Sequence, residues 1–165
     1  MRVLIVGVFH NHQPKKSSGD SDELQRAKDA LENLLQEAIE SRQVEFIGEE
    51  SKDGVETVAK QLADQHTPTI TWVNIDMTDE EALAAGIPDA SARNAKRRFL
   101  DGDTMTWKEC RIPEDEIRES FFADKTKREA GDVASILIVC GHGHVECLRT
   151  KFQKLGDQVE VCSGS

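Results

Sequence analysis

The sequence predicts a single α/β domain over residues 1–165, in which helices cover both faces of a mainly parallel β-sheet of about five strands. Short apolar runs alternate along the chain with longer segments whose apolar residues recur at helical spacing. Two of these runs, 2–8 and 134–140, are continuous and rich in Val and Ile, which is typical of strands buried on both faces. A chain of 165 residues is long enough for one core and short for two.

Five segments have the composition and length of strands. RVLIVGV (2–8) and ASILIVC (134–140) are the clearest, because they are almost entirely apolar. VEFIG (44–48) is short and apolar, whereas TITWVNID (69–76) and QVEVC (158–162) alternate in polarity. Because predicted helices separate successive strands, a mainly parallel sheet is expected.

Four segments are expected to be helices, and the first two of them repeat apolar residues at helical spacing: 21–42, 53–65, 113–129 and 144–156. Asp20 or Ser21 is a suitable N-cap for the first of them. The third begins with acidic residues and ends with basic ones, which matches the helix dipole. Gly156 is placed to end the last helix.

The stretch 77–110 is the least regular part of the chain. TDEEALAAG (78–86) is expected to form a short helix that ends at Gly86. DASARNAKRRFLDGD (89–103) is either a second helix or an excursion from the domain. The stretch is therefore expected to be a helical or loop insert.

Composition limits the class of partner. The chain has 21 basic and 31 acidic residues, so its formal charge is −10, which argues against a nucleic-acid or membrane partner. The apolar run before His10 is too short for a signal segment or a membrane span. The four cysteines show no C-x-x-C spacing, and we expect them to be reduced thiols in a cytoplasmic protein.

Chemically active side chains follow four of the predicted strands. In a parallel sheet the carboxyl ends of the strands share one edge, and ligands bind outside that edge. We therefore expect a common site for the residues that come just after the strands: His10 and His12, Glu49 and Glu50, Asp76, and His142 and His144.

Imidazoles and carboxylates on one edge are ligands that suit a divalent metal ion such as zinc, manganese or iron. The same groups can act as general acids and bases. Each residue also has an ordinary interpretation: His12 is a polar loop residue, Asp76 caps a helix, and Cys140 and Cys147 pack in the core. A chelate formed locally by Cys140, His142 and His144 is disfavoured.

Three short motifs resemble a known superfamily. GVFH (7–10) and GHGH (141–144) are both G-x-x-H, and the glutamate pair of GEES (48–51) lies between them. This arrangement is similar to that of the superfamily that joins Tiki proteases, TraB-type proteins, erythromycin esterases and ChaN-like haem-uptake proteins. The chain differs in having no membrane helix, which many Tiki and TraB members carry, and it is shorter than the esterases.

The resemblance implies an α/β core with His10 and His144 as the principal site histidines and Glu49 and Glu50 as their acidic partners. The segment IRESFF resembles the arginine-containing helix of that group, which implies that Arg118 contacts an oxyanion or a substrate carboxylate. The alternative for Arg118 is an exposed helix residue paired with Glu114.

Three functions follow from these features. The first is a metal-dependent hydrolase that cleaves an ester, amide or peptide bond of a small-molecule or peptide substrate. The second is a protein that binds a metal ion, haem or a small ligand without turnover. The third is a regulatory interaction protein whose cleft has lost its chemistry. The oligomeric state is left open, a homo-oligomer included.

Overall fold

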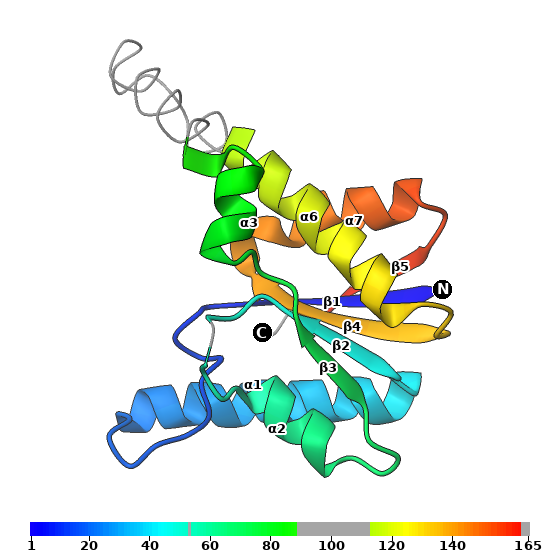
Figure 1. The fold of residues 1–165 in the computed structure, drawn as a ribbon. Helices are drawn as coiled ribbons and strands as arrows, with labels where there is room; N and C mark the ends of the chain where they lie inside the picture. Colours follow the sequence, from blue (N-terminus) through cyan, green and yellow to red (C-terminus); the bar gives the residue numbers. More distant parts are fainter. Residues whose placement is uncertain (53, 89–112, 163–165) are drawn as a thin grey trace.

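The computed structural model describes residues 1–52, 54–88 and 113–162. It contains a five-stranded, all-parallel sheet in the order β3-β2-β4-β1-β5, with helices on both faces (Figure 1). The strands are β1 (Arg2–Val8), β2 (Phe46–Glu49), β3 (Thr71–Asn74), β4 (Ser135–Gly141) and β5 (Gln158–Cys162). The helices are α1 (Asp22–Arg42), α2 (Val58–Gln65), α3 (Asp79–Ala84), α6 (Pro113–Ala130) and α7 (Val145–Lys154), and a 3₁₀ turn η2 (His142–His144) precedes α7. The predicted α/β class is confirmed.

One helix start and one helix cap differ from the sequence-based prediction. The helix expected from residue 53 begins only at Val58, because Thr57 has an extended backbone and its hydroxyl accepts a hydrogen bond from the backbone N–H of Lys60. The cap of α3 is Thr78, which forms a capping box with Glu81, and not Asp76.

No helix of the described part of the chain is long and apolar enough to cross a membrane.

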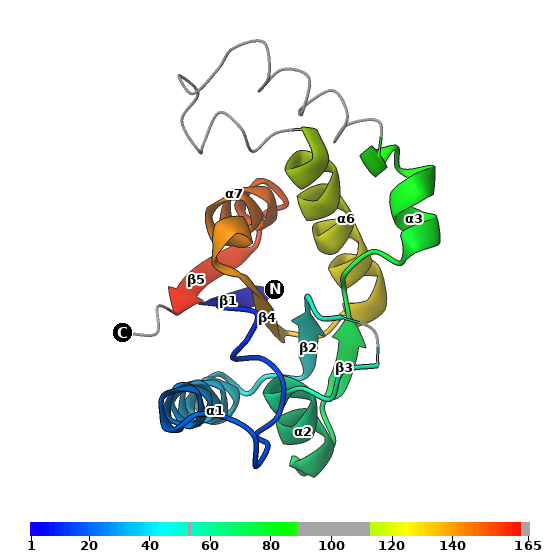
Figure 2. The same cartoon turned by 90° about the vertical axis from the view of Figure 1, so that its left-hand side faces the viewer.

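The sheet separates two apolar cores, each covered by the helices that Figure 2 shows on either side of the sheet. Helices α1 and α2 pack on one face, where Leu35 and Ala63 are fully buried against Leu137 and Val139 of β4. Helices α6 and α7 pack on the other face, where Phe122 and Phe152 contribute to the core. Every residue of β4 is buried, which explains why this strand is continuously apolar in the sequence.

The strand order places a ligand crevice beside the end of β4. Strand β4 lies between β1 and β2, and its chain continues into α7 on one face of the sheet. Strands β1 and β2 continue into α1 and α2 on the opposite face. Adjacent strands whose connections leave on opposite faces open a crevice between their carboxyl ends. The described fold therefore brings the segments after β1, β2 and β4 together.

The predicted insert lies largely beyond the part of the chain that the structure describes. Helix α3 occupies its first portion, as expected from TDEEALAAG, and Gly86 follows with a positive φ of 77°. The helix or excursion predicted over 89–103 lies outside the described residues, as does Cys110.

Candidate functional site

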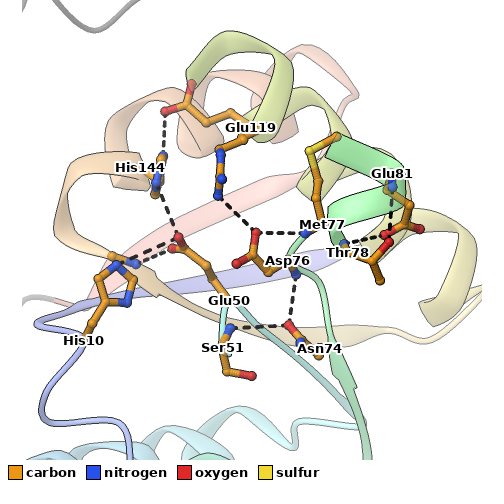
Figure 3. A network of polar contacts seen from close by, with 12 residues as sticks. His10, Glu50, Ser51, Asn74, Asp76, Met77, Thr78, Glu81, Glu119 and His144 are labelled. Atoms are coloured by element: carbon orange, nitrogen blue, oxygen red, sulfur yellow. Dashed lines mark hydrogen bonds and ion pairs between the residues drawn. The ribbon is translucent and has the colours of Figure 1, made fainter. Parts of the chain in front are cut away.

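His10 and His144 meet at the carboxylate of Glu50 (Figure 3). The Nε2 atom of His144 lies 3.5 Å from Oε1 of Glu50, and Nε2 of His10 lies 3.9 Å from the same oxygen. The two histidines are more than 130 positions apart in the sequence and reach the carboxylate from the ends of β1 and β4. This juxtaposition agrees with the expectation that the strand ends share one edge.

Strand pairing fixes the position of Glu50. Its backbone N–H donates to the carbonyl of Val139 at 2.9 Å and extends the pairing of β2 with β4 by one residue. Its Oε2 accepts a hydrogen bond of 2.8 Å from the backbone N–H of Gly141. The side chain is only 7% exposed, and hydrogen bonds to the end of β4 fix both the backbone and the carboxylate of Glu50.

His144 is held by a second carboxylate on α6. Its Nδ1 donates to Oε1 of Glu119 at 3.0 Å, because a carboxylate oxygen only accepts. The ring also packs edge-on against Phe122, with 5.6 Å between ring centroids. Burial lowers the pKa of His144, but the hydrogen bond to Glu119 and the nearby charges of Glu50, Glu119 and Asp115 outweigh it, and the net pKa is raised. The imidazolium form of His144 is therefore favoured by two flanking carboxylates.

His10 is the exposed member of the site, with 61% of its side chain accessible. Its Nδ1 makes a 2.9 Å hydrogen bond with Oε1 of Gln13, a buried residue three positions along the loop after β1. Gly141 leaves the space that the ring occupies, since a β-carbon there would lie 2.8 Å from Nε2 of His10. The ring therefore sits against the backbone at the end of β4.

The adjacent glutamates of GEES have different surroundings. Glu49 is fully buried, and its carboxyl oxygens accept hydrogen bonds from Gln13, Thr57 and Trp72 at 3.1, 2.6 and 2.8 Å. Burial raises the pKa of Glu49, and the three hydrogen bonds act in the opposite direction. Because successive strand residues face opposite sides, Glu49 extends toward α2 while Glu50 contacts the histidines. The pair therefore contributes one carboxylate to the crevice and one to its support.

Asp76 and Arg118 form an ion pair beside the site. Their side chains are 3.3 Å apart and partly exposed, and Nζ of Lys125 donates to the backbone carbonyl of Asp76 at 3.1 Å. Arg118 precedes Glu119 on α6, so the helix that holds His144 also carries this guanidinium. The structure thus places Asp76 with a cation rather than with a histidine.

His12 and His142 both contact the ring of Phe9. The Phe9 ring packs edge-on against both imidazoles, with centroid distances of 5.4 Å to His12 and 5.3 Å to His142. His142 also occupies the space over Gly7, where a β-carbon would lie 2.8 Å from its Nδ1. Both histidines border the site, and the contacts described for them are with Phe9 and Gly7 rather than with Glu50.

A small open cavity lies at the carboxyl ends of β1 and β4. Its volume is about 250 Å³, and its lining includes Phe9, His10, Asp115, His142 and His144. Roughly 300–1,000 Å³ is usual for sites that bury drug-sized ligands. The cavity therefore suits a small group or one end of a larger molecule.

The imidazole and carboxylate groups of the site are of the kinds that bind divalent metal ions. In the described residues, however, their positions do not form a metal site. Each principal histidine has its Nδ1 engaged by an outer partner, as in histidines that bind metal through Nε2. Among the residues that the structure describes, no group of three or more His, Cys, Asp or Glu side chains is arranged so that it could hold a metal ion. Binding would require the exposed ring of His10 to move toward Glu50.

The cysteines near β4 do not belong to the donor set. Cys140 is fully buried in the core under α6 and α7, as the packing interpretation expected. Burial, with smaller contributions from the charges of Glu50 and Glu119, raises the pKa of its thiol. Cys147 and Cys162 are partly exposed, so the expectation that Cys147 is buried in the core was wrong.

Sequence reasoning missed Gln13 and Glu119. Glu119 is an acidic residue three and four positions before the buried Phe122 and Ala123, so it lies on the buried face of its helix. That position is a detectable signal, since an acidic side chain on an apolar helix face needs a partner. Gln13 lies in a polar loop and carries no comparable signal in the sequence.

The fold and the site define an α/β protein with an all-parallel sheet and a histidine and glutamate crevice at its carboxyl edge. No family model matches the chain, and no significant match was found among curated proteins or solved structures. The resemblance to the Tiki and erythromycin esterase superfamily accordingly remains a hypothesis that rests on the motifs.

Proposed function

We propose that this chain is a metal-assisted hydrolase that activates water at His10, Glu50 and His144. The observation that carries the proposal is the convergence of both Nε2 atoms on one oxygen of Glu50, at 3.9 and 3.5 Å. Two imidazoles and a carboxylate around one point can accept a proton from water and return it to a leaving group. The bond cleaved is an ester, amide or peptide bond.

The two histidines have different environments and hence different roles in this proposal. The pKa of His144 is raised by the carboxylates beside it, so His144 is suited to donate a proton to the leaving group. His10 is exposed and lines the cavity, so its Nε2 is suited to accept a proton from water. The carboxylate of Glu50 lies between the two Nε2 atoms and would stabilise a positive charge on either ring. A hydrogen bond from the backbone N–H of Gly141 fixes its position.

If a divalent cation is bound, His10, Glu50 and His144 would hold it through the atoms that converge on Glu50, in place of the proton transfers by the two histidines, because an Nε2 bound to a metal ion cannot also carry or accept a proton. When bound, such an ion lowers the pKa of water and polarises the carbonyl that is attacked. Glu119 and Gln13 would orient His144 and His10 through hydrogen bonds to Nδ1, as the hydrogen-bond partners of metal-binding histidines do. Arg118 carries the positive charge suited to a developing oxyanion or a substrate carboxylate.

Binding without turnover is the second candidate, and the cavity favours a metal ion or a small ligand over haem. The volume of about 250 Å³ is small for a macrocycle, since roughly 300–1,000 Å³ is usual for drug-sized ligands. A titration with haem tests this directly, because a shift of the Soret band would favour haem binding.

The test uses tag-free protein, with zinc or manganese as the probe. Thermal unfolding and elemental analysis are measured for the wild type, His10→Ala and His144→Ala, with hydrolysis of p-nitrophenyl esters and peptide anilides assayed in parallel. His66→Ala is the matched control, because its ring lies near the end of α2 and contacts the carbonyl of Pro68 at 2.9 Å.

We expect bound metal to stabilise the wild type by about 2.7 kcal/mol at a metal concentration 100 times the Kd. His10→Ala and His144→Ala should lose this stabilisation and the hydrolysis, while His66→Ala should retain both. Metal binding in the wild type without hydrolysis would favour the second candidate. A wild type that neither binds these ions nor hydrolyses any probe would reject the hydrolase and the binding of zinc or manganese.

A further inference from the structure

Only one orientation of the Gln13 side-chain amide satisfies the hydrogen-bonding groups around it. Gln13 is 4% exposed, and its Nε2 donates to Oε1 of Glu49 at 3.1 Å and to the backbone carbonyl of Glu50 at 2.7 Å. Both partners are acceptors. Reversing the amide would place its oxygen against two oxygens, which is unfavourable in a buried position.

This orientation determines which nitrogen of His10 carries the proton. The remaining polar atom of Gln13, Oε1, faces Nδ1 of His10 at 2.9 Å. An amide oxygen only accepts hydrogen bonds, so Nδ1 must be the donor. In a neutral imidazole the other nitrogen is then unprotonated, and here that nitrogen is the Nε2 that faces Glu50.

Glu49 holds Gln13 in place beside the start of α2. Its Oε2 accepts hydrogen bonds from Thr57 at 2.6 Å and from Trp72 at 2.8 Å, which leaves Oε1 directed at Gln13. Thr57 also caps α2, and Trp72 belongs to β3. Two elements of the fold therefore fix the carboxyl group that fixes the amide.

We infer that Gln13 is a positioning residue that holds neutral His10 in the Nδ1–H tautomer, and that Glu49 keeps Gln13 in the orientation this requires. The inference deepens the proposed function and rests on it for the role of His10 Nε2 as the acceptor at the site. The tautomer itself is a property of the folded chain and can be measured without substrate or metal.

The experiment is ¹⁵N NMR of the imidazole rings in metal-free protein, at a pH above the ordinary histidine pKa of about 6.5. The His10 signals are identified by their loss in His10→Ala. Gln13→Leu removes the amide. Trp72→Phe is the matched control, because it removes one hydrogen bond to Glu49 and leaves both amide contacts of Gln13 in place.

In the wild type and in Trp72→Phe, we expect Nδ1 of His10 to resonate as a protonated nitrogen and Nε2 as an unprotonated one. In Gln13→Leu the two signals should move toward each other, as expected for a mixture of tautomers. A purely structural role of Gln13 would lower the melting temperature and leave these signals unchanged. A wild-type ring protonated at Nε2, or signals unaltered in Gln13→Leu, would overturn the inference.

The outcome is separable from that of the proposed function. A wild type with the Nδ1–H tautomer that neither binds zinc nor hydrolyses a probe rejects the function and leaves the positioning role intact. Zinc binding that depends on His10 but is accompanied by the Nε2–H tautomer in the metal-free protein rejects the positioning role alone.

Discussion

The imidazole of His10 lies so close to Gly141 that a β-carbon at position 141 would be 2.8 Å from Nε2 and 3.1 Å from Cε1. The reverse relationship holds between the same two segments, because His142 occupies the space over Gly7. Each G-x-x-H segment thus contains a glycine that makes room for a histidine of the other. The two segments are complementary in shape as well as adjacent in the sheet.

Gly141→Ala is expected to displace His10 while preserving the fold. The two atoms that the new β-carbon would crowd belong to an exposed ring that can rotate into solvent, and the next atom, Oε2 of Glu50, would lie at an ordinary contact distance of 3.4 Å. We expect the free energy of unfolding in urea to stay within about 1 kcal/mol of the wild type. The response to zinc should be lost, as in His10→Ala.

Gly7→Ala is the matched variant, and it should cost stability. Its β-carbon would lie 2.6 Å from Cγ2 of Val145, a buried side chain of α7. Crowding a packed core in this way costs about 1–3 kcal/mol. Equal stabilities for Gly7→Ala and Gly141→Ala would contradict this account of the two contacts.

The stability of the protein should depend on the titration of His144. Its pKa is raised in the folded state, so its contribution to stability is fully present below the unfolded value of about 6.5. The contribution is lost as the pH rises through the folded pKa. We expect the wild-type free energy of unfolding to decline over that interval, as measured by urea denaturation at a series of pH values.

Two variants test whether the titration of His144, and not a general effect of pH, causes this decline in stability. His144→Gln should abolish that part of the decline, and Glu119→Gln should lower the pKa of His144 in an NMR titration, since it removes the hydrogen-bonded charge. His66→Gln should show the wild-type decline. An unchanged pKa of His144 in Glu119→Gln would show that the 3.0 Å contact does not set it.

Thr57→Val should destabilise the protein more than Thr78→Val does. Both threonines cap helices, and loss of such a cap costs about 0.5–2 kcal/mol. Thr57 also donates to the buried carboxyl of Glu49 at 2.6 Å, and losing a partner of a buried acceptor costs about 1–3 kcal/mol more. Urea denaturation of both variants tests the difference, and equal losses would indicate that the contact with Glu49 adds nothing.

Arg118→Gln should affect activity far more than stability. The ion pair with Asp76 is partly exposed, and such pairs contribute about 1 kcal/mol or less. Removing a group that stabilises an oxyanion lowers kcat by about 100-fold or more. Arg149→Gln is the control, because Arg149 pairs with Glu146 on α7. Unchanged hydrolysis in Arg118→Gln would remove Arg118 from the proposed mechanism.

The regular elements could be predicted where a single periodic pattern extends over the whole element. Strands β1 and β4 are continuous apolar runs because both of their faces are buried, and the predicted bounds agree with the structure to within a residue. The start of α2 was misplaced because Thr57 turns its hydroxyl to the helix backbone and to Glu49. A pattern of apolar residues contains no information about such a contact.

The sequence alone determined the α/β class and the gathering of His10, Glu50 and His144 at one edge, because parallel strands place their carboxyl ends together. Only the tertiary structure decided that Glu49 turns away to hold Gln13 and that Glu119 supports His144. The physical reason is that residue spacing specifies the edge on which a side chain emerges. Its partners depend on which elements pack beside it.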